Sequence, residues 1–273
     1  MLAEARDGAW LAYDVKGDGE PLLLVMGLSG SRRGWYRLRP RLVPHCRTIA
    51  LDNRGTGDSD RVTGLLTMEA LVGDAVAVLD AAGVDSAHVL GVSMGGMVAQ
   101  HLALDHRERV RSLVLGCTTA GGRDGSPPWR LLAATALRPV VGITRTFPLI
   151  TPALYAQRTR DEQPRRVEED LRIRLADATD VRTTLAQMAA VARHDTRDRL
   201  HELAGLEVTV IHGAEDALMP PDAGRTLAAA IPGARLVMIP ACGHMLTTDA
   251  EEEAARAALG HLERARSRSP APA

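Results

Sequence analysis

Ser93 lies in a segment whose residue types and spacing suit a nucleophile. Residues 91–95 read GVSMG, so glycines stand two positions before and two positions after the serine. A sharp turn that exposes a serine hydroxyl needs minimal side chains on both flanks. The apolar run 88–91 before Ser93 and the helical periodicity of 94–103 after it predict a strand-to-helix turn. We therefore predict that Ser93 is a catalytic nucleophile.

His244 and Asp216 are the candidates for the base and the acid that a serine nucleophile requires. His244 ends the segment PACGH after the last predicted strand, and Asp216 lies in HGAEDALMP after the strand before it. Loops that follow parallel strands emerge at one edge of a sheet, so both residues are expected at the edge that carries Ser93. We expect His244 to accept the proton of Ser93 and Asp216 to orient His244. The neighbouring Glu215 is expected to point to solvent.

The elements that position these residues alternate between apolar runs and helical patterns. Such alternation is typical of a parallel sheet with helices on both faces. Residues 9–15, followed by the turn sequence Gly-Asp-Gly, predict an antiparallel strand at the leading edge. Six apolar runs predict buried parallel strands: 22–26, 48–51, 88–91, 113–115, 208–211 and 236–239. Helices are predicted at 68–82, 94–103 and 225–230.

The alternation stops after Cys117 and resumes at Val208. Residues 118–206 begin with a Gly/Pro-rich stretch and show helical segments but no strand pattern, with breaks expected at Pro139, Pro148, Pro152 and Pro164. An insertion of this kind predicts a helical cap over the carboxyl edge of the sheet, where open α/β sheets bind ligands. The alternative is an independently folding second domain. The predicted organisation is a core of 1–117 and 207–264, a cap of 118–206 and a disordered tail of 265–273.

The composition fits a globular protein and argues against several classes of partner. Of the 273 residues 45% are apolar and 25% charged, which is enough for a sizeable core. The formal net charge of −1 gives no electrostatic case for nucleic acid or an anionic membrane. The three cysteines, Cys46, Cys117 and Cys242, show neither disulfide nor metal-ligand spacing. With no signal-peptide pattern and no long apolar run, we expect a cytoplasmic protein.

In combination, these motifs resemble the α/β-hydrolase superfamily, particularly its esterase, enol-lactonase and methylesterase-like members. Besides the segment around Ser93, residues 52–60 (DNRGTGDSD) are similar to the family pattern D-x-R-G-x-G-x-S. The segment 213–216 (GAED) with Pro220, and the Gly-His pair ending at His244, also match. The resemblance covers 1–117 and 206–262. It implies a mostly parallel eight-stranded sheet with a helical cap inserted after strand 6, and neither a cofactor nor a metal.

The resemblance also implies an oxyanion hole formed by the backbone N–H groups of Leu28 and Met94. Family members usually show His-Gly after the strand that here ends at Met26, where this chain reads MGLSG. Backbone donors do not depend on side-chain identity, so the hole is expected to persist. Met26 removes the side-chain hydrogen bonding that usually braces this loop and adds an apolar group. Asp52 and Arg54 are expected to brace the loop through a charge-assisted hydrogen bond.

The expected function is that of a serine hydrolase. It would cleave a carboxylic ester or lactone of a small to medium, hydrophobic substrate through an acyl-enzyme on Ser93. Alternatives are C–C bond hydrolysis, thioester hydrolysis, cofactor-free perhydrolase or lyase chemistry, and a receptor-like member that only binds its ligand. The partner is a small-molecule substrate, and the chain is expected to be a monomer or homodimer. The expected pocket residues are Met26, Trp35, Met97, Met219 and Met245.

Overall fold

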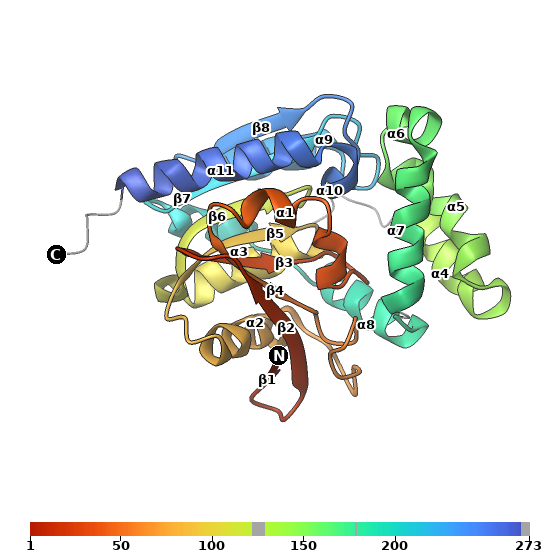
Figure 1. Ribbon diagram of the computed structural model, residues 1–273, viewed down its shortest axis with the longest axis horizontal. Coiled ribbons are helices and arrows are strands. Elements are labelled where there is room, and N and C mark those ends of the chain that lie inside the picture. The colour runs from red at the N-terminus through yellow and green to blue at the C-terminus, as the bar shows by residue number, and fades with distance from the viewer. Residues whose placement is uncertain (122–128, 178, 269–273) are drawn as a thin grey trace.

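The chain forms an eight-stranded mixed sheet with helices on both faces and a helical insertion after the sixth strand (Figure 1). This computed structural model describes residues 1–121, 129–177 and 179–268, of which 129–132 through the backbone only. The strands are β1 (Leu2–Glu4), β2 (Trp10–Lys16), β3 (Pro21–Val25), β4 (Arg47–Leu51), β5 (Ala87–Val92), β6 (Val110–Gly116), β7 (Glu207–Gly213) and β8 (Arg235–Ile239). Their order is β1-β2-β4-β3-β5-β6-β7-β8.

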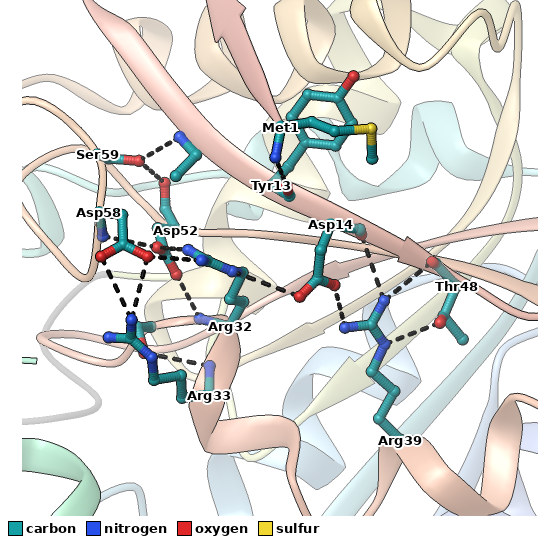
Figure 2. Close-up of polar contacts among 12 residues, drawn as sticks. Met1, Tyr13, Asp14, Arg32, Arg33, Arg39, Thr48, Asp52, Asp58 and Ser59 are labelled. Carbon is teal, nitrogen blue, oxygen red and sulfur yellow. Dashed lines mark hydrogen bonds and ion pairs between the residues drawn. The ribbon is translucent and has the colours of Figure 1, made fainter. Parts of the chain in front are cut away.

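The predicted fold class is confirmed, with one difference at the sheet edge. Every predicted parallel run overlaps one of the parallel strands β3 to β8. The predicted antiparallel strand is β2, but β1 pairs outside it, so the prediction that residues 9–15 form the edge is wrong. A strand of three residues is too short to show alternation in the sequence. Its pairing is reinforced by the amino group of Met1, which donates to the carbonyl of Tyr13 at 2.9 Å (Figure 2).

Two apolar layers hold helices on the two faces of the sheet. The core helices are α1 (Arg39–Leu42), α2 (Met68–Ala81), α3 (Met94–Asp105), α9 (Pro221–Ala230), α10 (Leu246–Asp249) and α11 (Glu251–Arg268), with short 3-10 turns η1 (Arg32–Trp35) and η2 (Arg107–Arg109). Along β3, Leu23 and Val25 point into the layer shared with α2, α3 and α9, while Leu22 and Leu24 point into the layer shared with α1 and α11. Figure 1 shows α1 and α11 over one face and α2 and α3 under the other.

The insertion, residues 118–206, supplies helices at one end of the sheet. Figure 1 shows α4 to α7 gathered there, beyond the strand ends. Their bounds are α4 (Trp129–Val141), α5 (Ile143–Leu154), α6 (Gln157–Glu162), α7 (Pro164–Asp177) and α8 (Val181–Ala192), followed by the 3-10 segment η4 (Arg197–Leu203). No helix among the residues that the structure describes is long and apolar enough to cross a membrane.

Three of the four prolines expected to break the insertion lie inside helices. Pro139 lies in α4, and Pro148 and Pro152 lie in α5. Only Pro164 begins a helix, at the first position of α7, where the missing N–H costs nothing. Burial of Phe147 and Leu154 on the inner face of α5 offsets the hydrogen bonds that its prolines remove.

The predicted start of the disordered tail, residue 265, is wrong. Helix α11 continues through Arg268, past residue 265, where the disordered tail was expected to begin. Its last turns are held by ion pairs of Arg264 and Arg268 with Glu207, each with a shortest contact of 2.9 Å, and by a bond from Arg266 to Glu20. Residues 269–273 lie outside the described residues.

Candidate active site

Ser93 stands at a strained turn between β5 and α3. Its φ of 54° and ψ of −122° lie outside the regions that L-residues ordinarily adopt. The flanking glycines are required by close backbone approach. A Cβ on Gly91 would lie 2.2 Å from the carbonyl oxygen of Gly95, and a Cβ on Gly95 would lie 2.1 Å from that of Val25. The geometry explains why the segment 91–95 reads G-x-S-x-G.

The structure brings Ser93, His244 and Asp216 into one hydrogen-bonded chain. His244 Nε2 lies 2.9 Å from Ser93 Oγ, and His244 Nδ1 lies 2.8 Å from Asp216 Oδ2. With its proton on Nδ1 donated to Asp216, the neutral imidazole presents Nε2 as the acceptor for the serine hydroxyl. This arrangement can remove a proton from Ser93 as it attacks a carbonyl carbon and stabilise the resulting imidazolium.

Asp216 is fixed in place from behind by its own loop. Its Oδ1 accepts the backbone N–H groups of Leu218 at 2.9 Å and Met219 at 2.8 Å, which leaves Oδ2 for His244. Asp216 is only 2% exposed, whereas Glu215 is exposed and accepts the N–H of Gln157 at 3.1 Å. A carboxylate held by two amides has one position available and so orients the imidazole.

His212 is a further buried group behind the carboxylate, and sequence reasoning missed it. Its Nε2 lies 3.4 Å from Asp216 Oδ2 and 2.9 Å from the carbonyl oxygen of Met219. Burial lowers the pKa of His212, so the ring stays neutral and donates to the Met219 carbonyl. The only sequence signal was a histidine at the end of a strand, four residues before Asp216.

The loop that carries His244 is tied to the insertion by Asp249. One carboxylate oxygen of Asp249 accepts the N–H of Gly243 at 2.7 Å and that of Ala156 at 2.8 Å. The N–H of Met245 also donates to the carbonyl of Leu154 at 2.9 Å. Asp249 and the carbonyl of Leu154 therefore connect the loop of His244 to the end of α5 and the start of α6.

The predicted oxyanion donors lie on the two segments that flank Ser93. Leu28 lines the same cavity as Ser93, and Met94 opens α3, where the first amides have no partner within the helix. The loop containing Leu28 runs close to the nucleophile, since a Cβ on Gly27 would lie 3.0 Å from the Cβ of Ser93. Both N–H groups therefore remain candidate donors to an oxyanion beside Ser93.

Other side chains brace this loop in place of the histidine that Met26 replaces. Asn53 Nδ2 donates to the carbonyl of Met26 at 2.8 Å, and the N–H of Ser29 donates to Gln187 Oε1 at 2.7 Å. Gln187 comes from α8 and in turn donates to the carbonyl of Arg54 at 3.2 Å. The loop is thus held from both the core and the insertion.

Asp52 and Arg54 both form charge-assisted hydrogen bonds, as expected, but each does so with its own partners. Figure 2 shows Asp52 receiving the N–H of Arg32 at 2.7 Å, the guanidinium of Arg32 and the N–H of Asp58 at 2.9 Å. Arg54 instead pairs with Asp74, its Nη2 lying 2.5 Å from Oδ1. Neither residue is among the described residues that line the cavity at Ser93.

A cavity of about 130 Å³ opens above Ser93 and His244. Met26 and Met245 line it as predicted, with Leu28, Leu218 and Leu246. The insertion supplies the opposite wall, which the sequence did not reveal: Ala134, Thr135, Arg138, Ile143, Thr146, Phe147, Ile150, Leu154, Arg174 and Thr184.

Three predicted pocket residues are not among the described residues that line this cavity. Trp35 is fully buried under the sheet face that carries α1 and α11, and Met97 points from α3 into the opposite apolar layer. Met219 uses its backbone to hold Asp216 and His212, and its side chain packs against the same layer as Met97. Being near the motif in sequence did not decide the direction of these side chains.

One cluster of potential metal ligands was found among the described residues, namely Cys117, Asp216 and His244, whose ligand atoms lie within 4.8 Å of one another. Two of these groups already hydrogen bond to each other. Burial and the charge of Asp216 raise the pKa of the Cys117 thiol well above its ordinary value. Because Asp216 and His244 are already bonded to each other and to Ser93, we assign this cluster to the Ser93 site.

Comparison with known proteins identifies the family. The model of the alpha/beta hydrolase fold matches residues 20–250, and the chain belongs to this family. The protein named "Putative carbamate hydrolase RutD" of Azorhizobium caulinodans is 32% identical over 234 residues, which cover 84% of this chain and 86% of that protein. The prediction of an α/β-hydrolase from the sequence is confirmed.

Solved structures agree with this family over nearly the whole chain. A thermophilic esterase from Thermogutta terrifontis is 27% identical with a TM-score of 0.86, covering 97% of this chain and 98% of that one. Est816, an N-acyl homoserine lactone degrading enzyme, is 28% identical with a TM-score of 0.82, covering 95% of this chain and 99% of that one. The protein is therefore a hydrolase of the α/β-hydrolase fold.

Proposed function

We propose that the protein hydrolyses a carboxylic ester or lactone through an acyl-enzyme on Ser93. The observation that carries this proposal is the 2.9 Å contact between Ser93 Oγ and His244 Nε2 at the floor of the cavity. Similarity to an esterase and to a lactone-degrading enzyme supports the same bond type. The mostly apolar lining suits a substrate with an apolar body.

The reaction follows from the order of the groups. Ser93 Oγ bonds to the carbonyl carbon while His244 takes its proton, and the N–H groups of Leu28 and Met94 hold the oxyanion. His244 then gives the proton to the leaving alkoxide as the C–O bond of the ester breaks. A water molecule, deprotonated by His244, attacks the acyl-enzyme, and the acid and free Ser93 are released.

The test combines covalent labelling with turnover. A fluorophosphonate probe should modify Ser93, as read by peptide mass spectrometry, and the label should be absent from Ser93→Ala. A panel of acyl esters and lactones of graded size should show turnover that Ser93→Ala abolishes. An unlabelled Ser93, or full esterase activity in Ser93→Ala, would contradict the proposal. Turnover confined to thioesters or to carbon–carbon bonds would support Ser93 as the nucleophile but would contradict a carboxylic ester or lactone as the bond that is cleaved.

A further inference from the structure

Two arginines line the wall of the cavity that the insertion supplies. Arg138 comes from α4 and Arg174 from α7, and both line the cavity that Ser93 and His244 line from the core. Neither forms an ion pair with any carboxylate among the side chains that the structure describes. By contrast, Arg166 of α7 is paired and lies 2.7 Å from Glu251.

These two guanidinium groups make few contacts with the described residues, and none of those contacts is with a carboxylate. Arg138 donates to the carbonyl of Thr179. Arg174 has an N–H group 3.9 Å from the sulfur of Met245, and its guanidinium carbon lies 5.8 Å from the ring centroid of Phe147. A guanidinium carries five N–H donors, so most of these donors have no partner among the described residues.

The electrostatic balance of this wall is unfavourable without an anion. Burial and the positive charge of Arg174 both lower the pKa of Arg138, and the negative charge of Asp180 offsets only part of this. Two like charges in a mostly apolar wall repel each other and lose hydration, and a bound anion relieves both costs. A planar carboxylate matches the fork of N–H donors that a guanidinium presents.

We propose that Arg138 and Arg174 bind a carboxylate at the far end of the substrate's acyl chain, so that the substrate is a half-ester or a carboxylate-bearing lactone. This inference rests on the proposed function of Ser93. The cavity of about 130 Å³ resembles in size a cavity of about 150 Å³ that holds benzene. Because the cavity is small, the proposed acyl chain is short, with its carbonyl at Ser93 and its carboxylate at the arginines.

The kinetic test compares two esters of the same shape. Monomethyl glutarate carries a carboxylate, and methyl glutaramate replaces that carboxylate with a neutral amide. We expect wild type to prefer the half-ester in kcat/KM, and Arg138→Gln and Arg174→Gln each to lower kcat/KM for it by about tenfold or more. The same variants should change kcat/KM for the neutral ester less than about threefold, because a purely structural defect would affect both esters. Arg174→Lys should recover part of the loss because it keeps the charge.

Arg172→Gln is the matched control. Arg172 lies on α7 near Arg174, but its side chain is 70% exposed and its ion-pair partner is Glu168 at 3.8 Å. It should leave both esters unaffected. Equal losses for the two esters in Arg138→Gln and Arg174→Gln, or no preference for the half-ester in wild type, would overturn the inference.

A binding measurement separates this inference from the proposed chemistry. Glutarate should bind Ser93→Ala in calorimetry, glutaramide should bind at least about tenfold more weakly, and the added Arg138→Gln or Arg174→Gln should remove the difference. Glutarate binding without turnover of any ester would support the anion site and refute the ester chemistry. Turnover of neutral esters without glutarate binding would support the ester chemistry and refute the anion site.

Discussion

The carboxyl edge of the sheet and the insertion above it are fixed by different physical constraints. At the edge, backbone atoms approach so closely that Gly91 and Gly95 admit no Cβ. In the insertion, α5 contains Pro148 and Pro152 and leaves Leu149 exposed. The edge is set by local sterics, whereas the insertion is set by packing against the core. We therefore propose that the residues at the sheet edge carry out the reaction, while the residues of the insertion that line the cavity select the substrate.

Buried carboxylates on α7 fasten the insertion to the core. Asp170, only 5% exposed, accepts the hydroxyls of Tyr36 at 2.8 Å, Tyr155 at 2.9 Å and Thr248 at 2.7 Å. Thr248 follows His244 closely in the chain, so the same carboxylate reaches the loop of the candidate base. The sheet edge and the insertion are thus fixed by different constraints, but hydrogen bonds join them close to His244.

The largest effect should come from adding one methyl group at the edge. Gly95→Ala places a Cβ against the carbonyl of Val25 and should lower the free energy of unfolding by about 3 kcal/mol or more, with loss of activity. Gly73→Ala is the control, because a Cβ there meets nothing within 4 Å in helix α2, and it should stabilise by about 0.5 to 1 kcal/mol. Urea denaturation measures both. Equal stability of the two variants would refute a steric origin of the turn.

The next effect concerns the orientation of the base. Asp216→Asn keeps the volume but offers a neutral amide to His244, and kcat should fall by about 10³- to 10⁴-fold. Glu215→Gln, at the exposed neighbouring position, should leave kcat within about twofold, because exposed charges contribute little. The comparison of ester turnover in the two variants distinguishes the orienting acid from its neighbour, and equal losses would contradict our assignment.

The sequence predicted the edge because the residue types there have few structural alternatives. Glycines are required on both sides of Ser93 because a Cβ there would lie near 2 Å from a backbone oxygen, and Asp216 and His244 each lie in the loop that follows a strand. His212 and Asp249 were missed, since each is a common residue type whose importance comes from a partner distant in sequence or from burial. A sequence motif can indicate the residues that react, but not the residues that position them through hydrogen bonds.

The insertion could be predicted as helical but not in detail. Its prolines were read as breaks, yet Pro139 lies within α4, and Pro148 and Pro152 lie within α5. Arg138 and Arg174 carried no motif, and only the packing of α4 and α7 brings them to one cavity. Side-chain direction on a helix depends on which face is buried, and that face is set by contacts with the core.

A smaller effect should come from the contact that joins the two regions at the oxyanion loop. Gln187→Met removes the acceptor for the N–H of Ser29 and the donor to the carbonyl of Arg54 without changing volume greatly. We expect kcat to fall by about tenfold with KM nearly unchanged. The substitution would displace the loop that carries the N–H of Leu28, but it would not change the side chains of the loop that line the cavity. Leu185→Ala, at a 52% exposed position on the same helix, is the control. A change in KM alone would assign Gln187 to substrate binding instead.

The last prediction concerns a pH dependence of stability at the point where the insertion returns to the core. His194 is 3% exposed, its Nε2 lies 3.0 Å from the carbonyl of Thr119, and burial lowers its pKa from 6.5 to about 4. The unfolded chain therefore binds a proton at this histidine more readily than the folded chain does. As a result, the contribution of neutral His194 to the free energy of unfolding is fully present above pH 6.5 and is lost as the pH falls toward 4. Between pH 7 and pH 5 wild type should lose about 2 kcal/mol more than His194→Gln, which keeps a donor for Thr119 but does not titrate. Urea denaturation at the two pH values measures the difference, and parallel losses in both proteins would show that His194 does not couple protonation to folding.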